Sequence, residues 1–132
     1  MIAFVDTNIL IRHLTNDPPD QARRATAILE NSERLILTDV VVAELVYVLE
    51  SYYEQPKKQV AQAVQSLLTL PSIALADHDL VLRAIELYEH ARLDFAEAYL
   101  AAAAELSGVG SVASFDRTLD RVDGIERIQR SD

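Results

Sequence analysis

Short apolar runs alternate with longer amphipathic segments along this chain. The opening run, residues 1–5, is rich in Ile, Phe and Val and stops at Asp6. Apolar residues resume at Ile9 with helical spacing. We interpret the run as a buried strand that ends at Asp6 and is followed by a short helix over residues 8–14.

The same alternation continues to the C-terminus. The pattern predicts further strands at residues 34–37, 73–75, 111–115 and 125–128, and helices at 20–31, 40–53, 80–92 and 98–106. Another helix is opened by Pro56 and stopped by Pro71. Strands separated by helix-length connections imply a parallel sheet with helices on both faces. Because no linker or internal repeat divides the chain, we expect one α/β domain over residues 1–132.

Acidic residues recur where the predicted strands end or the helices begin. Asp6 ends a strand, Glu44 lies one turn into a helix, Asp94 and Glu97 start another helix, and Asp116 ends a later strand. In a parallel sheet these places lie at one edge, where ligands bind. We therefore expect the five acids to converge.

Convergence of carboxylates is unfavourable without a cation. Two of them about 4 Å apart repel by roughly 4 kcal/mol at an effective dielectric of about 20. A domain stable by only about 5–15 kcal/mol would not keep several such pairs for structure alone. Mg²⁺ and Mn²⁺ are hard cations that prefer carboxylate and water ligands, so either is the expected cofactor.

Each acid also has a structural alternative. Asp6 is a suitable N-cap for the first helix, Asp94 and Glu97 have the spacing of a capping box, and Asp116 can begin a turn. Glu44 can be a solvated helix residue, although its apolar neighbours argue against exposure. Helix capping and metal binding are compatible.

Composition and charge narrow the class of protein. The chain has 132 residues, half of them hydrophobic, and no Cys, so we expect a folded cytoplasmic protein whose metals bind through oxygen. Asp6 and Asn8 interrupt the first apolar run, which argues against a signal peptide or membrane anchor. The net charge of −9 argues against broad nucleic-acid binding, so a polyanionic substrate needs a cation or a local arginine patch. P-loop, zincin and serine-hydrolase motifs are absent from the sequence.

Four motifs in order resemble those of PIN-domain ribonucleases: Phe4-Val5-Asp6-Thr7-Asn8, Val42-Ala43-Glu44-Leu45, Leu93-Asp94-Phe95-Ala96-Glu97-Ala98 and Ser114-Phe115-Asp116. The resemblance extends from residue 2 to about 128. In size and motif order the chain is most similar to the VapC toxins of VapBC toxin–antitoxin systems. This implies an α/β/α sandwich with a parallel, about five-stranded sheet, Mg²⁺- or Mn²⁺-dependent endonucleolytic cleavage of RNA, a homodimer and a cognate VapB-type antitoxin.

The resemblance also implies roles for particular acids. Asp6, Glu44 and Asp116 match the metal-site acids of the family. Glu97 departs from the pattern, which usually has Asp there; the longer side chain can bind metal directly or through water. Asp94 is then either a further metal ligand or a helix cap.

The expected chemistry is hydrolysis by a water molecule that one or two metal ions orient and deprotonate. Other polar residues beside the acids have supporting roles. Hydrogen bonds to the carboxylates or the phosphate are expected from Thr7 and Ser114. Asn8 can form such a bond or cap its helix. The candidates for the local phosphate-binding patch are Arg12, Arg117 and Arg121.

Two alternative functions remain at this stage. One is a catalytically silent PIN-like module that binds protein, which the departure at Glu97 leaves open. The other is a phosphatase of the haloacid dehalogenase type, which also has a strand ending in Asp. That class needs a second Asp two residues after the first, and this chain has Asn8 there.

Overall fold

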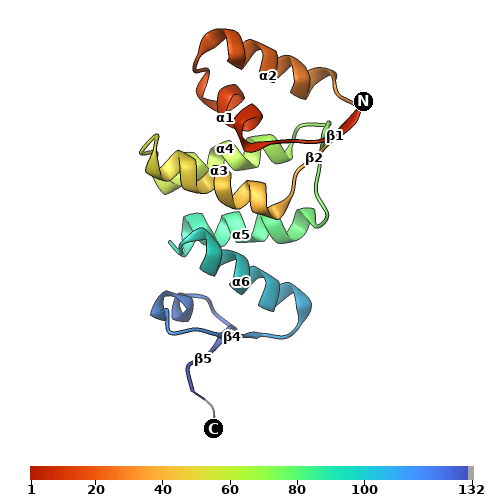
Figure 1. Cartoon of the computed structure of the whole chain (residues 1–132). Helices are drawn as coiled ribbons and strands as arrows, with labels where there is room; N and C mark the ends of the chain where they lie inside the picture. The colour runs from red at the N-terminus through yellow and green to blue at the C-terminus, as the bar shows by residue number, and fades with distance from the viewer. Residues whose placement is uncertain (131–132) are drawn as a thin grey trace. The chain divides into compact units, whose positions relative to one another are not determined.

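The computed structural model describes residues 1–130 (Figure 1). Residues 131 and 132, which the predicted domain includes, lie outside the described residues. The chain groups into two compact units, the first from Met1 to His78 and the second from Asp79 onwards. No helix within residues 1–130 is long and apolar enough to cross a membrane.

The first unit contains three parallel strands and four helices. In chain order these are β1 (Ile2–Phe4), α1 (Thr7–Thr15), α2 (Pro19–Asn31), β2 (Arg34–Ile36), α3 (Asp39–Ser51), α4 (Lys57–Leu68) and β3 (Ile73–Ala74). The sheet order is β1-β2-β3, with Ala3 opposite Leu35 and Leu35 opposite Ile73. Helix α1 packs against both α2 and α3 (Figure 1).

Local sequence signals set the helix starts of this unit. Asp6 occupies the N-cap of α1, and Pro19 lies in the first turn of α2, where its missing N–H costs nothing. Thr38 caps α3, because its Oγ1 accepts a hydrogen bond of 3.3 Å from the Val41 N–H. Buried apolar residues then hold the elements together, among them Leu10, Leu35, Leu45, Leu49, Val60 and Leu67.

The described part of the second unit, which ends at residue 130, contains two long helices, a short 3₁₀ helix and two strands. Its elements are α5 (His78–His90), α6 (Phe95–Ser107), β4 (Ser111–Ala113), η1 (Arg117–Arg121) and β5 (Glu126–Ile128). Strands β4 and β5 pair in parallel, and α6 packs on β4 and η1. Helix α6 ends at Gly108, whose φ of 81° is a left-handed conformation that glycine adopts without strain.

The mixed α/β class and the parallel pairing are confirmed, but the single five-stranded sheet is not. The five strands form a three-stranded sheet, β1-β2-β3, and a two-stranded sheet, β4-β5. Each strand has only two or three residues. Apolar runs locate such strands but do not specify which neighbours they pair with.

The first strand also differs from its predicted burial. Ile2 and Phe4 are exposed, whereas we expected a buried strand. Strand β1 lies at the end of the sheet order and pairs only with β2 within its sheet. Its position before Asp6 is nevertheless as predicted, so β1 delivers that acid to the start of α1.

Candidate functional site

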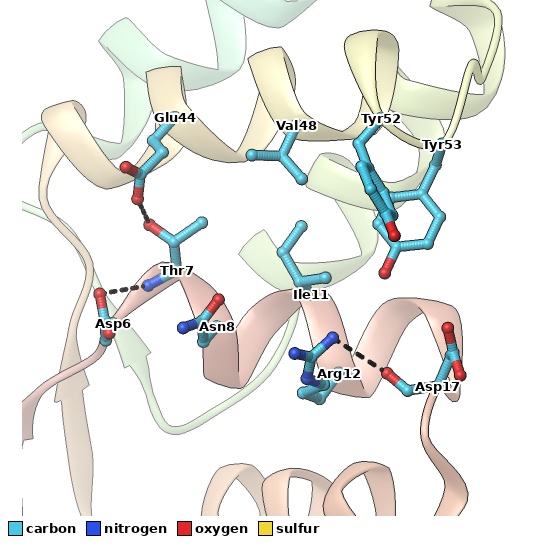
Figure 2. A pocket seen from close by; sticks show the side chains of 10 residues that line it. All are labelled: Asp6, Thr7, Asn8, Ile11, Arg12, Asp17, Glu44, Val48, Tyr52 and Tyr53. Carbon is cyan, nitrogen blue, oxygen red and sulfur yellow. Dashed lines mark hydrogen bonds between the residues drawn. The ribbon is translucent and has the colours of Figure 1, made fainter.

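An open pocket of about 520 Å³ lies in the first unit beside α1 and α3. It is lined by Asp6, Thr7, Asn8, Ile11, Arg12, Asp17, Glu44, Val48, Tyr52 and Tyr53. Figure 2 shows the side chains of the two helices facing one another across this space. The pocket therefore contains two of the predicted acids and three of their predicted polar neighbours.

Helical periodicity explains why these residues share the pocket. On α3, Glu44, Val48 and Tyr52 follow one another at intervals of four residues, so they lie on one face. On α1, Asn8 and Arg12 have the same spacing. The pocket consequently has an acidic end at Asp6 and Glu44, an apolar middle, and an end where the two tyrosines lie with Arg12 and Asp17 (Figure 2).

Thr7 joins the two acids of the acidic end. Its backbone N–H donates a hydrogen bond of 2.9 Å to Oδ1 of Asp6, and its hydroxyl donates to Oε1 of Glu44. Thr7 itself is only 4% exposed, whereas both carboxylates are exposed. Within residues 1–130, the second oxygens of Asp6 and Glu44 accept no hydrogen bond from a protein group, so both remain available to a ligand.

The exposure of Glu44 corrects the sequence-based expectation that its apolar neighbours would bury it. Val42, Leu45 and Val46 are buried, yet Glu44 is exposed. The reason is that α3 turns Glu44 toward the open pocket (Figure 2), whereas Val42, Leu45 and Val46 lie on other faces of the helix. Val40, another apolar neighbour, is itself 78% exposed.

Arg12 is held at the other end of the pocket by neutral groups. Its Nη1 donates to the backbone carbonyl of Asp17 at 3.2 Å, and its Nε donates to Oε1 of Gln21 at 3.1 Å. Within residues 1–130 Arg12 forms no ion pair with a carboxylate. Its charge is therefore not neutralised by direct pairing.

Two tyrosines at this end were not predicted from the sequence as site residues. Tyr52 and Tyr53 contact each other edge to face, with ring centroids 4.9 Å apart and an interplanar angle of 73°. Tyr52 is 77% exposed. The signal that points to Tyr52 is its spacing of eight residues from Glu44, which places both on one face of a helix.

In the second unit, Asp94 and Glu97 begin α6 but do not form the capping box that their spacing suggests. Asp94 has extended N-cap geometry, yet its side chain makes no capping hydrogen bond. Within residues 1–130 neither side chain has a hydrogen bond or an ion pair. The side-chain capping role considered for Asp94 is therefore wrong, and both carboxylates are free of protein partners.

Asp116 is fixed as a carboxylate by the residues around it. Its Oδ1 accepts hydrogen bonds from the side-chain hydroxyl of Thr118 at 2.6 Å and from the Thr118 N–H at 2.9 Å. These bonds, with smaller contributions from the charges of Arg121 and Arg127, lower the pKa of Asp116 below its ordinary value. Ser114 orients the same residue by accepting a hydrogen bond of 2.9 Å from the Asp116 N–H.

The three arginines predicted for phosphate binding have different surroundings. Arg12 lines the pocket with Asp6 and Glu44. Arg121 lies in the second unit, where its Nη1 donates to the carbonyls of Ala91 at 3.4 Å and Arg92 at 2.9 Å. Arg117 begins η1 in that unit and is exposed. Of the three, only Arg12 lines the same pocket as Asp6 and Glu44.

The donor chemistry fits a hard divalent cation, although no complete ligand group is formed. Among the described residues, no three His, Cys, Asp or Glu side chains lie close enough together to hold a metal ion. Asp6 and Glu44 offer free carboxylate oxygens in the first unit, and Asp94, Glu97 and Asp116 offer carboxylates in the second. Oxygen donors of this kind suit Mg²⁺ or Mn²⁺. The five-acid metal site stays a prediction.

Comparisons with known proteins agree with the motifs. The PIN domain family matches residues 3–125 of this chain. PIN domains are generally metal-dependent nucleases. A comparison with curated proteins finds no match.

Proposed function

Because this chain belongs to the PIN domain family, we propose that it is a metal-dependent endoribonuclease and the toxin of a VapBC-type toxin–antitoxin system. The observation that supports this most directly is the acidic end of the pocket. There, Thr7 bonds to both Asp6 and Glu44, and each acid keeps an oxygen free for a cation. Asp94, Glu97 and Asp116 are proposed as further acids that activity requires.

In this proposal Asp6 and Glu44 of the first unit would hold a divalent cation. Mg²⁺ or Mn²⁺ supplies Lewis-acid polarisation of the phosphodiester and lowers the pKa of water. Thr7 keeps Glu44 oriented, and Thr118 orients Asp116 and lowers its pKa. Arg12 contributes positive charge to a pocket that is otherwise acidic.

Water is the proposed nucleophile because the pocket offers no accessible alternative beside Asp6 and Glu44. The hydroxyls of Tyr52 and Tyr53 lie at the other end of the pocket (Figure 2). Its lining residues include no Ser, Cys or His. The Thr7 hydroxyl donates to Glu44, as a hydroxyl activated by a base would, but Thr7 is only 4% exposed. A buried hydroxyl of this kind serves to orient Glu44 rather than to attack a phosphodiester.

A nuclease assay with matched variants tests the catalytic part of the proposal. We expect the purified protein to cut labelled RNA internally with Mn²⁺ or Mg²⁺, to leave DNA of the same sequence intact, and to lose activity in EDTA. Glu44→Gln should be inactive, whereas Glu30→Gln, an exposed acid on α2, should cleave like the wild type. Activity in EDTA, equal activity of Glu44→Gln, or preferential cleavage of DNA would contradict the proposal.

The toxin role has a separate test. An acidic pocket is also a binding site for guanidinium groups, which pair with carboxylates without a metal. We therefore propose a cytoplasmic homodimer silenced by an antitoxin that carries an Arg- or Lys-rich tail. Production of the wild type alone should stop growth, Asp6→Asn should be harmless, and co-expression with the antitoxin should restore growth. Harmless production of an active wild type would refute the toxin role and leave a metal-dependent nuclease.

A catalytically silent protein-binding module is the second candidate, favoured by Glu97 at a position where the family pattern has Asp. Folded protein that binds Mn²⁺ without cleaving any nucleic acid would favour it. If the Glu97→Asp variant then cleaved nucleic acid, the longer Glu97 side chain would be the cause of the inactivity of the wild type. The phosphatase alternative loses its support, since the PIN domain match covers residues 3–125.

A further inference from the structure

We propose that the tyrosine end of the pocket binds an unpaired nucleotide of the RNA, whose base stacks on Tyr52. This inference rests on the proposed ribonuclease function and adds a substrate-binding subsite to it. Arg12 would assist through its charge.

The exposure of Tyr52 is the first observation. Tyr52 lies at the C-cap of α3 with 77% of its surface exposed, and it lines the pocket. Tyr53 contacts it edge to face, with ring centroids 4.9 Å apart, so the second ring supports the position of the first. Aromatic side chains at such positions stack on unpaired bases, because every base offers a flat π face.

The charges that line the pocket favour binding of an uncharged base over binding of a phosphate at the tyrosine end. Asp6, Asp17 and Glu44 line the pocket with a single cation, Arg12. An uncharged base is not repelled by the carboxylates, whereas a phosphate depends on a metal or on Arg12. Within residues 1–130 the Arg12 guanidinium bonds only to the Asp17 carbonyl and the Gln21 amide oxygen, so it keeps its charge for the backbone of the bound nucleotide.

Helix α3 sets the distance between the subsite and the acids. Eight residues separate Glu44 from Tyr52 on one helix face, a span of about 12 Å at roughly 1.5 Å per residue. The stacked nucleotide therefore lies a short distance along the strand from the phosphodiester that is cut. Bases within a duplex are covered on both faces by their neighbours, so this stretch of RNA must be unpaired.

Binding measurements with an internal control on α3 test the inference. Tyr47 is also exposed, at 69%, but does not line the pocket. In an Asp6→Asn background without metal, we would measure fluorescence anisotropy with a short labelled unstructured RNA and with the same RNA annealed to its complement. Tyr52→Leu should bind the single strand roughly 5- to 150-fold more weakly, the range expected for loss of one stacked base. Tyr52→Phe and Tyr47→Leu should retain binding.

A tryptophan reporter adds a direct readout of stacking. The chain contains no Trp, so Tyr52→Trp introduces a single indole. Its fluorescence should be quenched by the single-stranded RNA and much less by the duplex, while Tyr47→Trp should respond to neither. Quenching of Tyr52→Trp by an Arg-rich peptide but not by RNA would overturn the inference in favour of a protein ligand.

Failure of the subsite and failure of the proposed function are distinguishable. If the wild type cleaves RNA with Mn²⁺ but Tyr52→Leu binds single-stranded RNA like its parent, the nuclease stands and the subsite is wrong. Equal losses in Tyr52→Leu and Tyr47→Leu would also refute the subsite. A wild type that neither binds nor cleaves RNA would overturn both.

Discussion

The hydroxyl of Thr7 donates a hydrogen bond to the carboxylate of Glu44, which lies 37 residues further along the chain. This bond ties the start of α1 to the second turn of α3. Thr7 is buried while Glu44 is exposed, so the orientation of an exposed acid depends on a residue that solvent does not reach.

Thr7→Val should lower the turnover rate while keeping the fold. The substitution preserves the branched shape but removes the donor, so Glu44 loses its fixed orientation. We expect a loss of about 1 kcal/mol in the free energy of unfolding and a clear fall in kcat for RNA cleavage. Thr7→Ser, which keeps the hydroxyl, should retain most of the activity. Full activity in Thr7→Val would show that the hydrogen bond does not position Glu44 for catalysis.

Asp6→Asn should abolish RNA cleavage without unfolding the protein. Asp6 caps α1 through its hydrogen bond from the Thr7 N–H, and Asn is as good an N-cap as Asp. Loss of the charge also relieves repulsion with Glu44 in the metal-free protein. Thermal melting in EDTA should therefore be unchanged or slightly higher than that of the wild type. Calorimetric titration with Mn²⁺ should show much weaker binding, and wild-type binding would remove Asp6 from the metal site.

Divalent cations should raise the stability of the wild type. At a concentration one hundred times the dissociation constant, the gain is about 2.7 kcal/mol. The gain should be much smaller in Glu44→Gln or Asp116→Asn, with Glu30→Gln and Asp123→Asn as matched controls on exposed acids. Melting temperatures of the wild type and the variants, measured at increasing concentrations of Mg²⁺ and of Mn²⁺, test this prediction. A wild type indifferent to both metals would mean that the acids bind no cation.

Measurements of stability and activity can distinguish a metal-binding role of Asp94 and Glu97 from a helix-capping role. Since Asp94 makes no side-chain capping bond, Asp94→Ala should change the free energy of unfolding by less than about 0.5 kcal/mol. A helix cap would contribute about 1 kcal/mol. As metal-site acids, Asp94→Ala and Glu97→Gln should both reduce RNA cleavage. Full activity in both variants would exclude the start of α6 from the site.

Asp116 should titrate below the ordinary range of Asp because Thr118 donates two hydrogen bonds to it. A depressed pKa in the folded state stabilises the protein above the ordinary pKa of Asp, and this contribution is lost as the pH falls through the folded-state pKa. Thr118→Val removes the hydroxyl donor, so the pKa of Asp116 should rise, whereas Thr118→Ser should leave it low. Carboxyl NMR titration measures both, and an unchanged pKa in Thr118→Val would contradict this assignment.

Sequence patterns predicted the local elements better than their partners. Thr38 and Pro19 mark helix starts in the structure as they do in the sequence, because capping and proline geometry are local. The pairing of β1 depends on tertiary contacts that no three-residue strand encodes. This is why the single five-stranded sheet was predicted and two sheets are found.

For the candidate site, the sequence suggested which acids to consider but not what surrounds them. Asp6 and Glu44 were chosen as carboxylates at a predicted sheet edge, and both line one pocket. Their connection through Thr7 required three-dimensional coordinates, since it joins residues far apart in the chain. Tyr52 was missed because tyrosines at the end of an apolar helix resemble core residues until their exposure is known.

Glu44 lies within α3 and Tyr52 is the C-cap residue of the same helix, so this helix sets the separation between them. One residue inserted between them would rotate Tyr52 by about 100° around the helix axis and move it out of the pocket. Insertion of seven residues, close to two full turns, would restore its direction and lengthen the span by about 10 Å. The length of α3 between Glu44 and Tyr52 would thus determine how far from the stacked base the RNA is cut. Adding or removing whole helical turns would shift the cleavage position along the RNA.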